Sequence, residues 1–140
     1  MGVSVRRVTV VATAVALLMS GAVGVQAAST AEAVTCVRSS SDSFYVRGGT
    51  SWGFGVDWPG GNAKVKVTYR TPNSTTNIRV RLAVGGSSSS TILKGNAGRQ
   101  VTKTVSVGYK SRGDGTLWFE ASGGNPDSRR SVTSWCLYKS

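Results

Sequence analysis

Residues 64–70 read KVKVTYR, and apolar side chains alternate with polar ones at every position. Alternation with a period of two is typical of a β-strand that has one buried and one exposed face. The same pattern appears in WGFGVDW (52–58) and NIRVRLAV (77–84), and less regularly in VTKTVSV (101–107). These segments predict strands of antiparallel sheets, and no stretch outside the first 33 residues has a convincing helical period.

Further strands are predicted at 116–122 and 132–138, with shorter ones near 35–38, 44–47 and 91–93. Turn-forming sequences separate them, including Pro59-Gly60-Gly61-Asn62, the Gly85–Ser90 stretch and Asp114-Gly115. About eight strands at this spacing predict an all-β protein folded as an antiparallel β-sandwich, either Ig-like or jelly-roll-like. A small β-barrel is the alternative architecture.

The N-terminal segment has the composition of a secretory signal peptide. Arg6 and Arg7 precede an apolar run, and the small residues around Ala27 fit a cleavage site. We therefore predict a cleaved signal peptide at 1–27, an extended flexible arm at 28–35 and a single β-sandwich domain at 36–140. The predicted protein is secreted and is not an integral membrane protein.

The two cysteines of the chain, Cys36 and Cys136, lie close to the two ends of the predicted domain. Cysteines of an exported protein are usually paired. We predict a disulfide that joins the first strand to the last, with a structural role, because the chain has neither a CxxC motif nor a histidine to activate a thiol.

Composition argues against an enzyme. The 140 residues include no histidine and only six acidic residues, so triads, His-based zinc sites and clustered calcium ligands are not supported. We expect no catalytic residue, no metal site and no cofactor.

The charge balance suggests a binding surface. Removing Arg6 and Arg7 from the 17 basic residues leaves 15, so against 6 acids the mature net charge is 15 − 6 = +9. If strands 64–70 and 78–84 are neighbours, five cations share one exposed face: Lys64, Lys66, Arg70, Arg79 and Arg81. Such a face suits an anionic partner, although protection of exposed strand edges explains it equally well. Nucleic acid is an unlikely partner, because Tyr69 is the only aromatic residue in this stretch and its phase points inward.

The four tryptophans provide a second candidate surface. Trp52 and Trp58 lie on the apolar phase of their strand, which predicts core packing. Trp118 lies out of phase with Leu117 and Phe119, so its side chain points to the opposite face of the strand from theirs. Trp135 is likewise out of phase with Cys136, so only one of those two can point into the core. Burial between a sheet and a loop is the favoured interpretation for both, and Trp118 and Trp135 are the candidates for stacking on a sugar ring if they are exposed.

Together these features predict a secreted binding protein without catalytic activity. The leading hypothesis is an inhibitor or an adaptor subunit of a secreted or toxin complex, engaging another secreted or surface protein, and an acidic partner would suit the positive charge of the chain. A carbohydrate-binding module that uses exposed tryptophan to bind a polysaccharide is the second hypothesis. A cationic antimicrobial protein acting on anionic surfaces is the third.

Overall fold

The computed structural model describes residues 34–140, which form nine strands. Their bounds are β2 (Arg38–Ser40), β3 (Phe44–Val46), β4 (Trp52–Trp58), β5 (Gly61–Arg70), β6 (Asn77–Val84), β7 (Ser87–Leu93), β8 (Val101–Lys110), β9 (Gly113–Ser122) and β10 (Arg130–Lys139). This part of the chain holds no helix that is long and apolar enough to span a membrane. The predicted signal peptide, and the predicted arm up to residue 33, lie outside the described residues.

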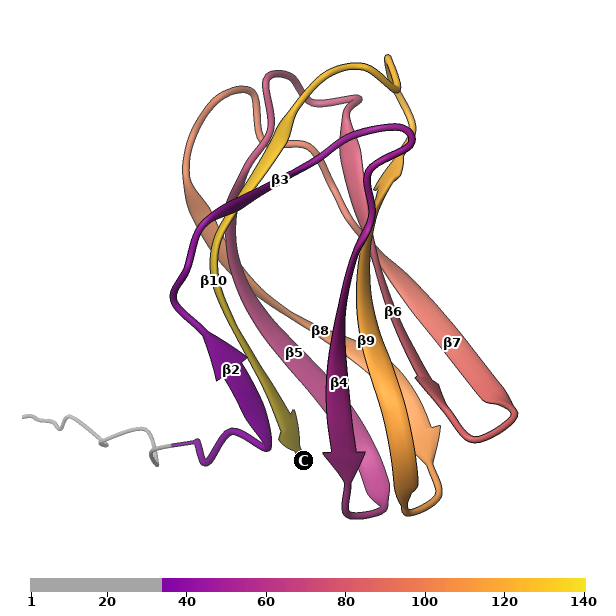
Figure 1. Cartoon of the computed structure of the whole chain (residues 1–140). Helices are drawn as coiled ribbons and strands as arrows, with labels where there is room; N and C mark the ends of the chain where they lie inside the picture. Colours follow the sequence, from indigo (N-terminus) through magenta and orange to yellow (C-terminus); the bar gives the residue numbers. More distant parts are fainter. Residues whose placement is uncertain (1–33) are drawn as a thin grey trace, which may run out of the picture. The chain divides into compact units, whose positions relative to one another are not determined.

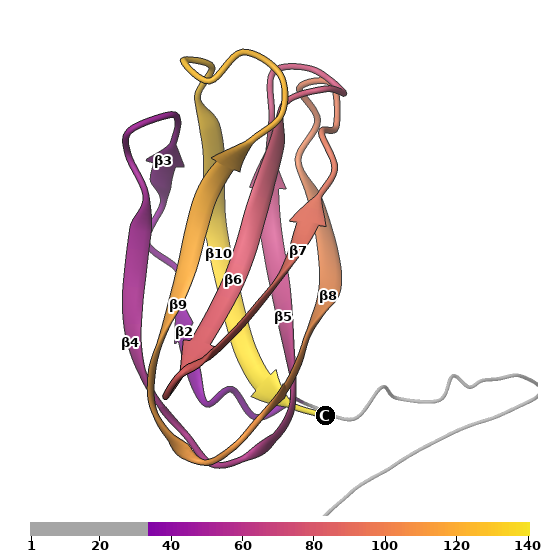
Figure 2. The ribbon, with the colours of Figure 1, turned by 90° about the vertical axis from the view of Figure 1, so that its right-hand side faces the viewer.

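The strands form two antiparallel sheets that face each other as a sandwich (Figures 1 and 2). One sheet has the order β2-β10-β5-β8, with β3 also paired to β10, and the other has the order β4-β9-β6-β7. Every connection passes from one sheet to the other except β2 to β3 and β6 to β7, which is the winding of a jelly roll. The predicted all-β sandwich is confirmed.

The barrel alternative is wrong, because no backbone ladder joins the edge strands β7 and β8. Hydroxyl groups of β7 cover this edge instead. Ser89 Oγ donates to the carbonyl oxygen of Val107 at 2.5 Å, and Thr91 Oγ1 donates to the carbonyl oxygen of Ser106. These bonds satisfy edge carbonyls without merging the two sheets.

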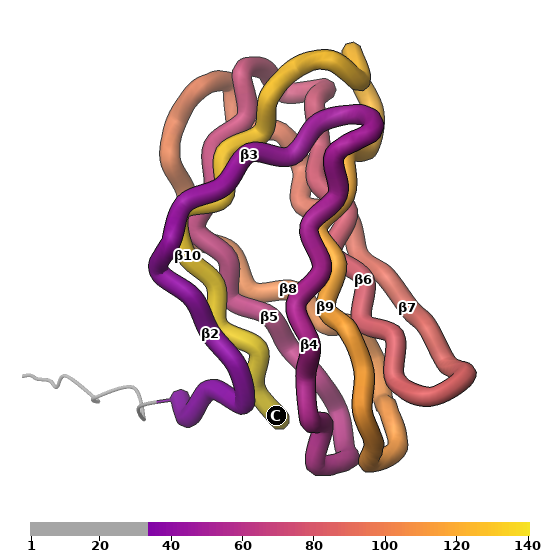
Figure 3. The backbone as a smooth tube through the Cα atoms, in the orientation of Figure 1, coloured from indigo at the N-terminus to yellow at the C-terminus, as the bar shows by residue number. Residues whose placement is uncertain are grey.

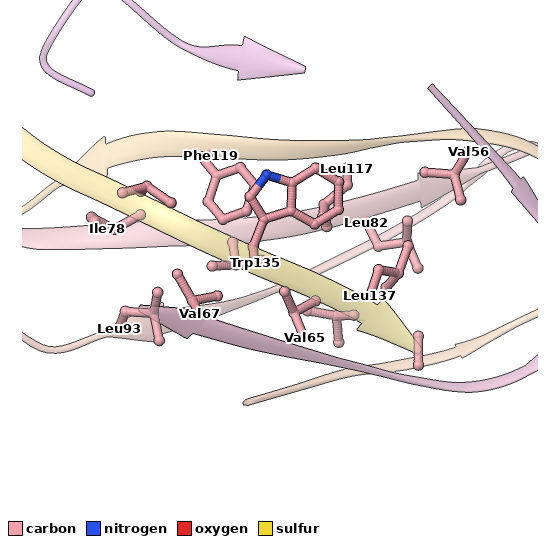
Figure 4. Packing of buried hydrophobic residues seen from close by; sticks show 14 of the residues in the cluster. Val56, Val65, Val67, Ile78, Leu82, Leu93, Leu117, Phe119, Trp135 and Leu137 are labelled. Atoms are coloured by element: carbon pink, nitrogen blue, oxygen red, sulfur yellow. The ribbon is translucent and has the colours of Figure 1, made fainter. Parts of the chain in front are cut away.

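The core is built from the apolar phase of each alternating strand (Figure 4). Side chains of 19 residues from both sheets form one buried cluster, in which Trp58, Phe119 and Leu137 are fully buried. Tyr69 also points inward as predicted, and its hydroxyl donates to the carbonyl oxygen of Lys94 at 2.6 Å. Burial raises the pKa of this hydroxyl above its ordinary value.

Two turns differ from the prediction. Gly85 and Gly86 alone connect β6 to β7, with Gly85 at a φ of 60°, so the serines at 87–90 form a strand rather than a hairpin tip. A two-residue turn of this kind fixes the register of the following strand whatever its composition. Asp114 and Gly115 lie within β9, and the turn before them is formed by Ser111 and Arg112.

The predicted disulfide is confirmed. Cys36 and Cys136 are bonded, with their Cα atoms 5.4 Å apart. Cys36 lies two residues before the start of β2, which pairs with β10, so the bond joins the first strand to the last. Closing a loop of this length is worth about 4.7 kcal/mol in the chain-entropy model.

Candidate functional site

Four loops meet at the end of the sandwich that lies uppermost in Figure 1. They connect β3 to β4, β5 to β6, β7 to β8 and β9 to β10. The β3–β4 connection is a tight hairpin, in which Arg47 and Thr50 exchange backbone hydrogen bonds. Figure 3 shows it crossing from one sheet to the other at the edge of the sandwich. A candidate site is built around this hairpin.

Trp52, at the start of β4, presents a fixed aromatic ring to solvent. Its side chain is 42% exposed, yet the indole Nε1 donates to the backbone carbonyl oxygen of Tyr45 at 2.8 Å. Its ring also lies 5.3 Å from that of Phe44, centroid to centroid. The ring is therefore held in place without being covered.

Tyr45, in the middle of β3, presents a second exposed ring. Phe44 and Val46 point into the core, so alternation directs Tyr45 outward, where 56% of it is exposed. The guanidinium carbon of Arg129 lies 5.1 Å from the centre of this ring, a cation–π contact.

Two hollows lie on either side of Tyr45 and Arg129, and both residues line both hollows. The aromatic hollow has a volume of about 490 Å³ and is also lined by Ser43, Phe44, Arg47, Thr50 and Trp52. The polar hollow has a volume of about 290 Å³ and is also lined by Arg70, Thr71, Pro72, Gln100 and Ser131. We call the two together the groove.

The buried Arg130 organises the loop that carries Arg129. It is fully buried, and its guanidinium donates to six backbone carbonyl oxygens, those of Asn77, Ser122, Gly123, Asn125, Pro126 and Ser128. Burial lowers the pKa of this guanidinium. The carbonyl oxygen of Pro126 also accepts the backbone N–H of Gly48 at 2.6 Å, which ties the β9–β10 loop to the β3–β4 hairpin.

The predicted cationic face does not form, because β5 and β6 belong to different sheets. Lys64, Lys66 and Arg70 lie on β5, whereas Arg79 and Arg81 lie on β6 in the opposite sheet. The two strands are separated because each pairs with other strands: β5 pairs with β8 and β10, and β6 pairs with β7 and β9. Of the five cations, Arg70 alone lines the groove.

Trp118 lies on the outer face of the second sheet, since Leu117 and Phe119 are both fully buried. Its ring is half-buried and lies over Gly53, where an added Cβ atom would come within 2.7 Å of the indole. The guanidinium of Arg81 is 5.5 Å from the ring centre and also pairs with Glu120 at 2.7 Å. Trp118 is thus partly covered by its own sheet.

The prediction that Trp135 offers an exposed stacking surface is wrong. Trp135 is only 3% exposed and packs against Phe54 and Phe119. A register shift between Val132 and Ser134 changes the phase of β10, so that Val132 and Trp135 both point inward. Cys136 therefore faces outward. The prediction that Trp52 packs in the core is also wrong, because β4 begins at the margin of the core.

The chain is similar in fold to several solved structures. No family model matches the chain, and no curated protein matches it. A carbohydrate-binding module of the CBM36 type, in complex with calcium and xylotriose, is 12% identical with a TM-score of 0.53, over 75% of this chain and 92% of that one. A CBM36-1 domain of a xylanase from the hindgut metagenome of Trinervitermes trinervoides is 12% identical with a TM-score of 0.54, over 70% of this chain and 77% of that one.

Some similar structures belong to enzymes. A GH115 4-O-methyl-α-glucuronidase is 12% identical with a TM-score of 0.56, and the match covers 83% of this chain but only 19% of that one. At such identities the likeness concerns the fold. Within residues 34–140, no three His, Cys, Asp or Glu side chains come together as a metal site.

These comparisons overturn the leading functional hypothesis of a protein-binding adaptor or inhibitor. The fold is similar to that of solved carbohydrate-binding modules. The positive charge, the predicted export and the lack of catalytic residues had suggested a protein partner, and none of these properties distinguishes a protein ligand from a polysaccharide. The carbohydrate-binding alternative is the better supported hypothesis.

Proposed function

We propose that the protein is a secreted, non-catalytic carbohydrate-binding module that binds a polysaccharide chain in the groove. The observation that carries the proposal is the pair of exposed aromatic rings, Trp52 and Tyr45, which flank the β3–β4 hairpin, are joined by a hydrogen bond and lie beside polar donors. Aromatic rings fixed in this way stack on the apolar faces of sugars at little entropic cost. The disulfide fits an oxidising environment, which supports export.

The similarity in fold to carbohydrate-binding modules supports the proposal, and the site itself rests on the geometry of this chain. Trp118 is the alternative stacking residue on the opposite sheet. Arg81 lies over its ring, so a sugar would first have to displace a guanidinium that is paired with Glu120.

The test compares these two tryptophans. The purified protein is retarded on native gels that contain soluble xylan, galactan or β-glucan, and the Trp52→Ala and Trp118→Ala variants are run beside it. We expect Trp52→Ala to weaken binding roughly tenfold or more, because the loss of a central aromatic contact commonly costs about 2 kcal/mol. Trp118→Ala is expected to bind like the wild type. Full retention of binding by Trp52→Ala would contradict the proposed site, and lack of binding to any polysaccharide would contradict the function.

A further inference from the structure

Three arginines line the groove, and no acidic residue does. Arg47 lines the aromatic hollow, Arg70 lines the polar hollow and Arg129 lines both. All three are exposed. The neighbouring acids in the sequence, Asp42 and Asp127, line neither hollow.

These arginines also have no carboxylate partner within the described residues. Between residues 34 and 140, the one close pair of opposite charges is Arg81 with Glu120, on the outer face of the other sheet. Arg129 contacts the Tyr45 ring instead. Three like charges around one groove repel each other, and an anionic ligand relieves that repulsion.

The two hollows differ in their aromatic lining. The larger one is lined by Phe44 and Trp52 together with Arg47, whereas the smaller one is lined by Arg70, Thr71, Gln100 and Ser131. Tyr45 and Arg129 form the wall that both share. A chain molecule lying across this wall meets aromatic rings and Arg47 on one side, and Arg70 with neutral polar groups on the other.

We infer that the ligand is an acidic glycan, in which one sugar ring packs on Trp52 and a neighbouring ring carries a carboxylate to Arg70 and Arg129. This inference rests on the proposed carbohydrate-binding function. A planar guanidinium binds a carboxylate through two parallel hydrogen bonds. Neutral hydroxyl groups of a sugar do not compensate three arginines, so a neutral polysaccharide leaves the charge of this groove unmatched.

The test uses one polymer in two forms. Binding of the full protein is measured by calorimetry with polygalacturonate and with the same polymer after its carboxylates have been reduced to alcohols. Dextran sulfate serves as a third ligand that has charge but no carboxylate. We expect the native polymer to bind about tenfold more tightly than the reduced one, as is reasonable for one or two charge-assisted hydrogen bonds.

The variants separate this inference from the proposed function. Arg70→Gln and Arg129→Gln are expected to lose the preference for the native polymer, whereas their affinity for the reduced polymer is expected to fall much less. Arg79→Gln is the matched control, because Arg79 is an exposed arginine on the other sheet. It is expected to behave like the wild type. Trp52→Ala is expected to lose binding to both forms.

Three outcomes would overturn the inference alone: equal binding of the native and the reduced polymer, equally tight binding of dextran sulfate, or an effect of Arg79→Gln as large as that of Arg70→Gln. If the wild type binds none of the three polymers, nor any neutral polysaccharide, the proposed function fails as well.

Discussion

The indole N–H of Trp52 donates a hydrogen bond of 2.8 Å to the backbone carbonyl oxygen of Tyr45. This bond fixes one exposed aromatic residue of the groove to the strand that carries the other. Replacing Trp52 with phenylalanine keeps an aromatic ring but removes the hydrogen bond. We therefore expect an affinity for polysaccharide between that of the wild type and that of the Trp52→Ala variant. A titration of the protein with polysaccharide, followed by tryptophan fluorescence, tests this expectation. The ligand-induced change is expected to vanish in Trp52→Phe and to persist in Trp118→Phe.

Gly48 permits the close contact between the two loops that form the groove. A Cβ atom at Gly48 would lie 2.9 Å from the Cβ of Pro126 and 3.1 Å from its carbonyl oxygen. We therefore expect Gly48→Ala to separate the β3–β4 hairpin from the β9–β10 loop and to weaken polysaccharide binding severalfold. Gly86→Ala is the control, because an added Cβ there meets nothing within 4 Å. Equal binding by the two variants would show that this contact does not shape the groove.

Arg130 is the positioning residue for the loop that carries Arg129. Arg130→Met would remove the buried guanidinium that donates to six backbone carbonyl oxygens, of which those of Asn125 and Pro126 keep a second donor, and we expect it to lower the free energy of unfolding by about 3 kcal/mol or more. Arg129→Gln, one residue away and exposed, is expected to change stability by less than about 0.5 kcal/mol. Urea unfolding followed by fluorescence measures both. A small effect of Arg130→Met would contradict this role.

Two buried tryptophans differ in one hydrogen bond. Trp58 Nε1 donates to the carbonyl oxygen of Lys110 at 3.1 Å, whereas Trp135 Nε1 has no hydrogen-bond partner within residues 34–140. An unpaired buried donor costs about 1–3 kcal/mol. Both replacements by phenylalanine open a cavity, but Trp135→Phe also removes the unpaired donor. We therefore expect Trp135→Phe to destabilise the protein less than Trp58→Phe does in the same urea experiment. The reverse order would contradict this assignment.

Tyr69 makes the stability of the fold sensitive to alkaline pH. Because burial raises the pKa of its hydroxyl above 10.0, the folded state favours the neutral form, which donates to the Lys94 carbonyl oxygen. This contribution is complete below about pH 10 and is lost as the pH rises through the folded-state pKa. The difference in unfolding free energy between the wild type and Tyr69→Phe should therefore shrink above pH 10. A difference that stays constant from pH 8 to pH 11 would contradict this linkage.

The sequence predicted the strands well because their alternation is local. Residues 52–58 were predicted as a strand, and β4 has those bounds. The Cys36–Cys136 bond followed from the export signal and the number of cysteines. Local alternation does not predict which strands are neighbours, because the pairing of β5 with β8 and β10 joins segments that are far apart in the chain. The prediction of one cationic face was wrong for that reason.

Two residues of the groove were missed for a different reason. Alternation in FYV (44–46) would have identified Tyr45 as outward-facing, had the orientation of that short strand been considered. Trp52 carried no such signal, because its phase matches the core, and its exposure comes from its position at the end of β4. The register shift that buries Trp135 is likewise not visible as a sequence pattern.

The disulfide has a mechanical consequence. Cys36 and Cys136 lie next to the two ends of the described domain, and Figure 1 places those ends at the pole opposite the groove. Force applied between the two ends of the described domain would pass from one to the other through the covalent bridge, and the strands that the bridge encloses would carry none of it. A load applied between those ends and a ligand in the groove would instead pass along the strands that join the two poles.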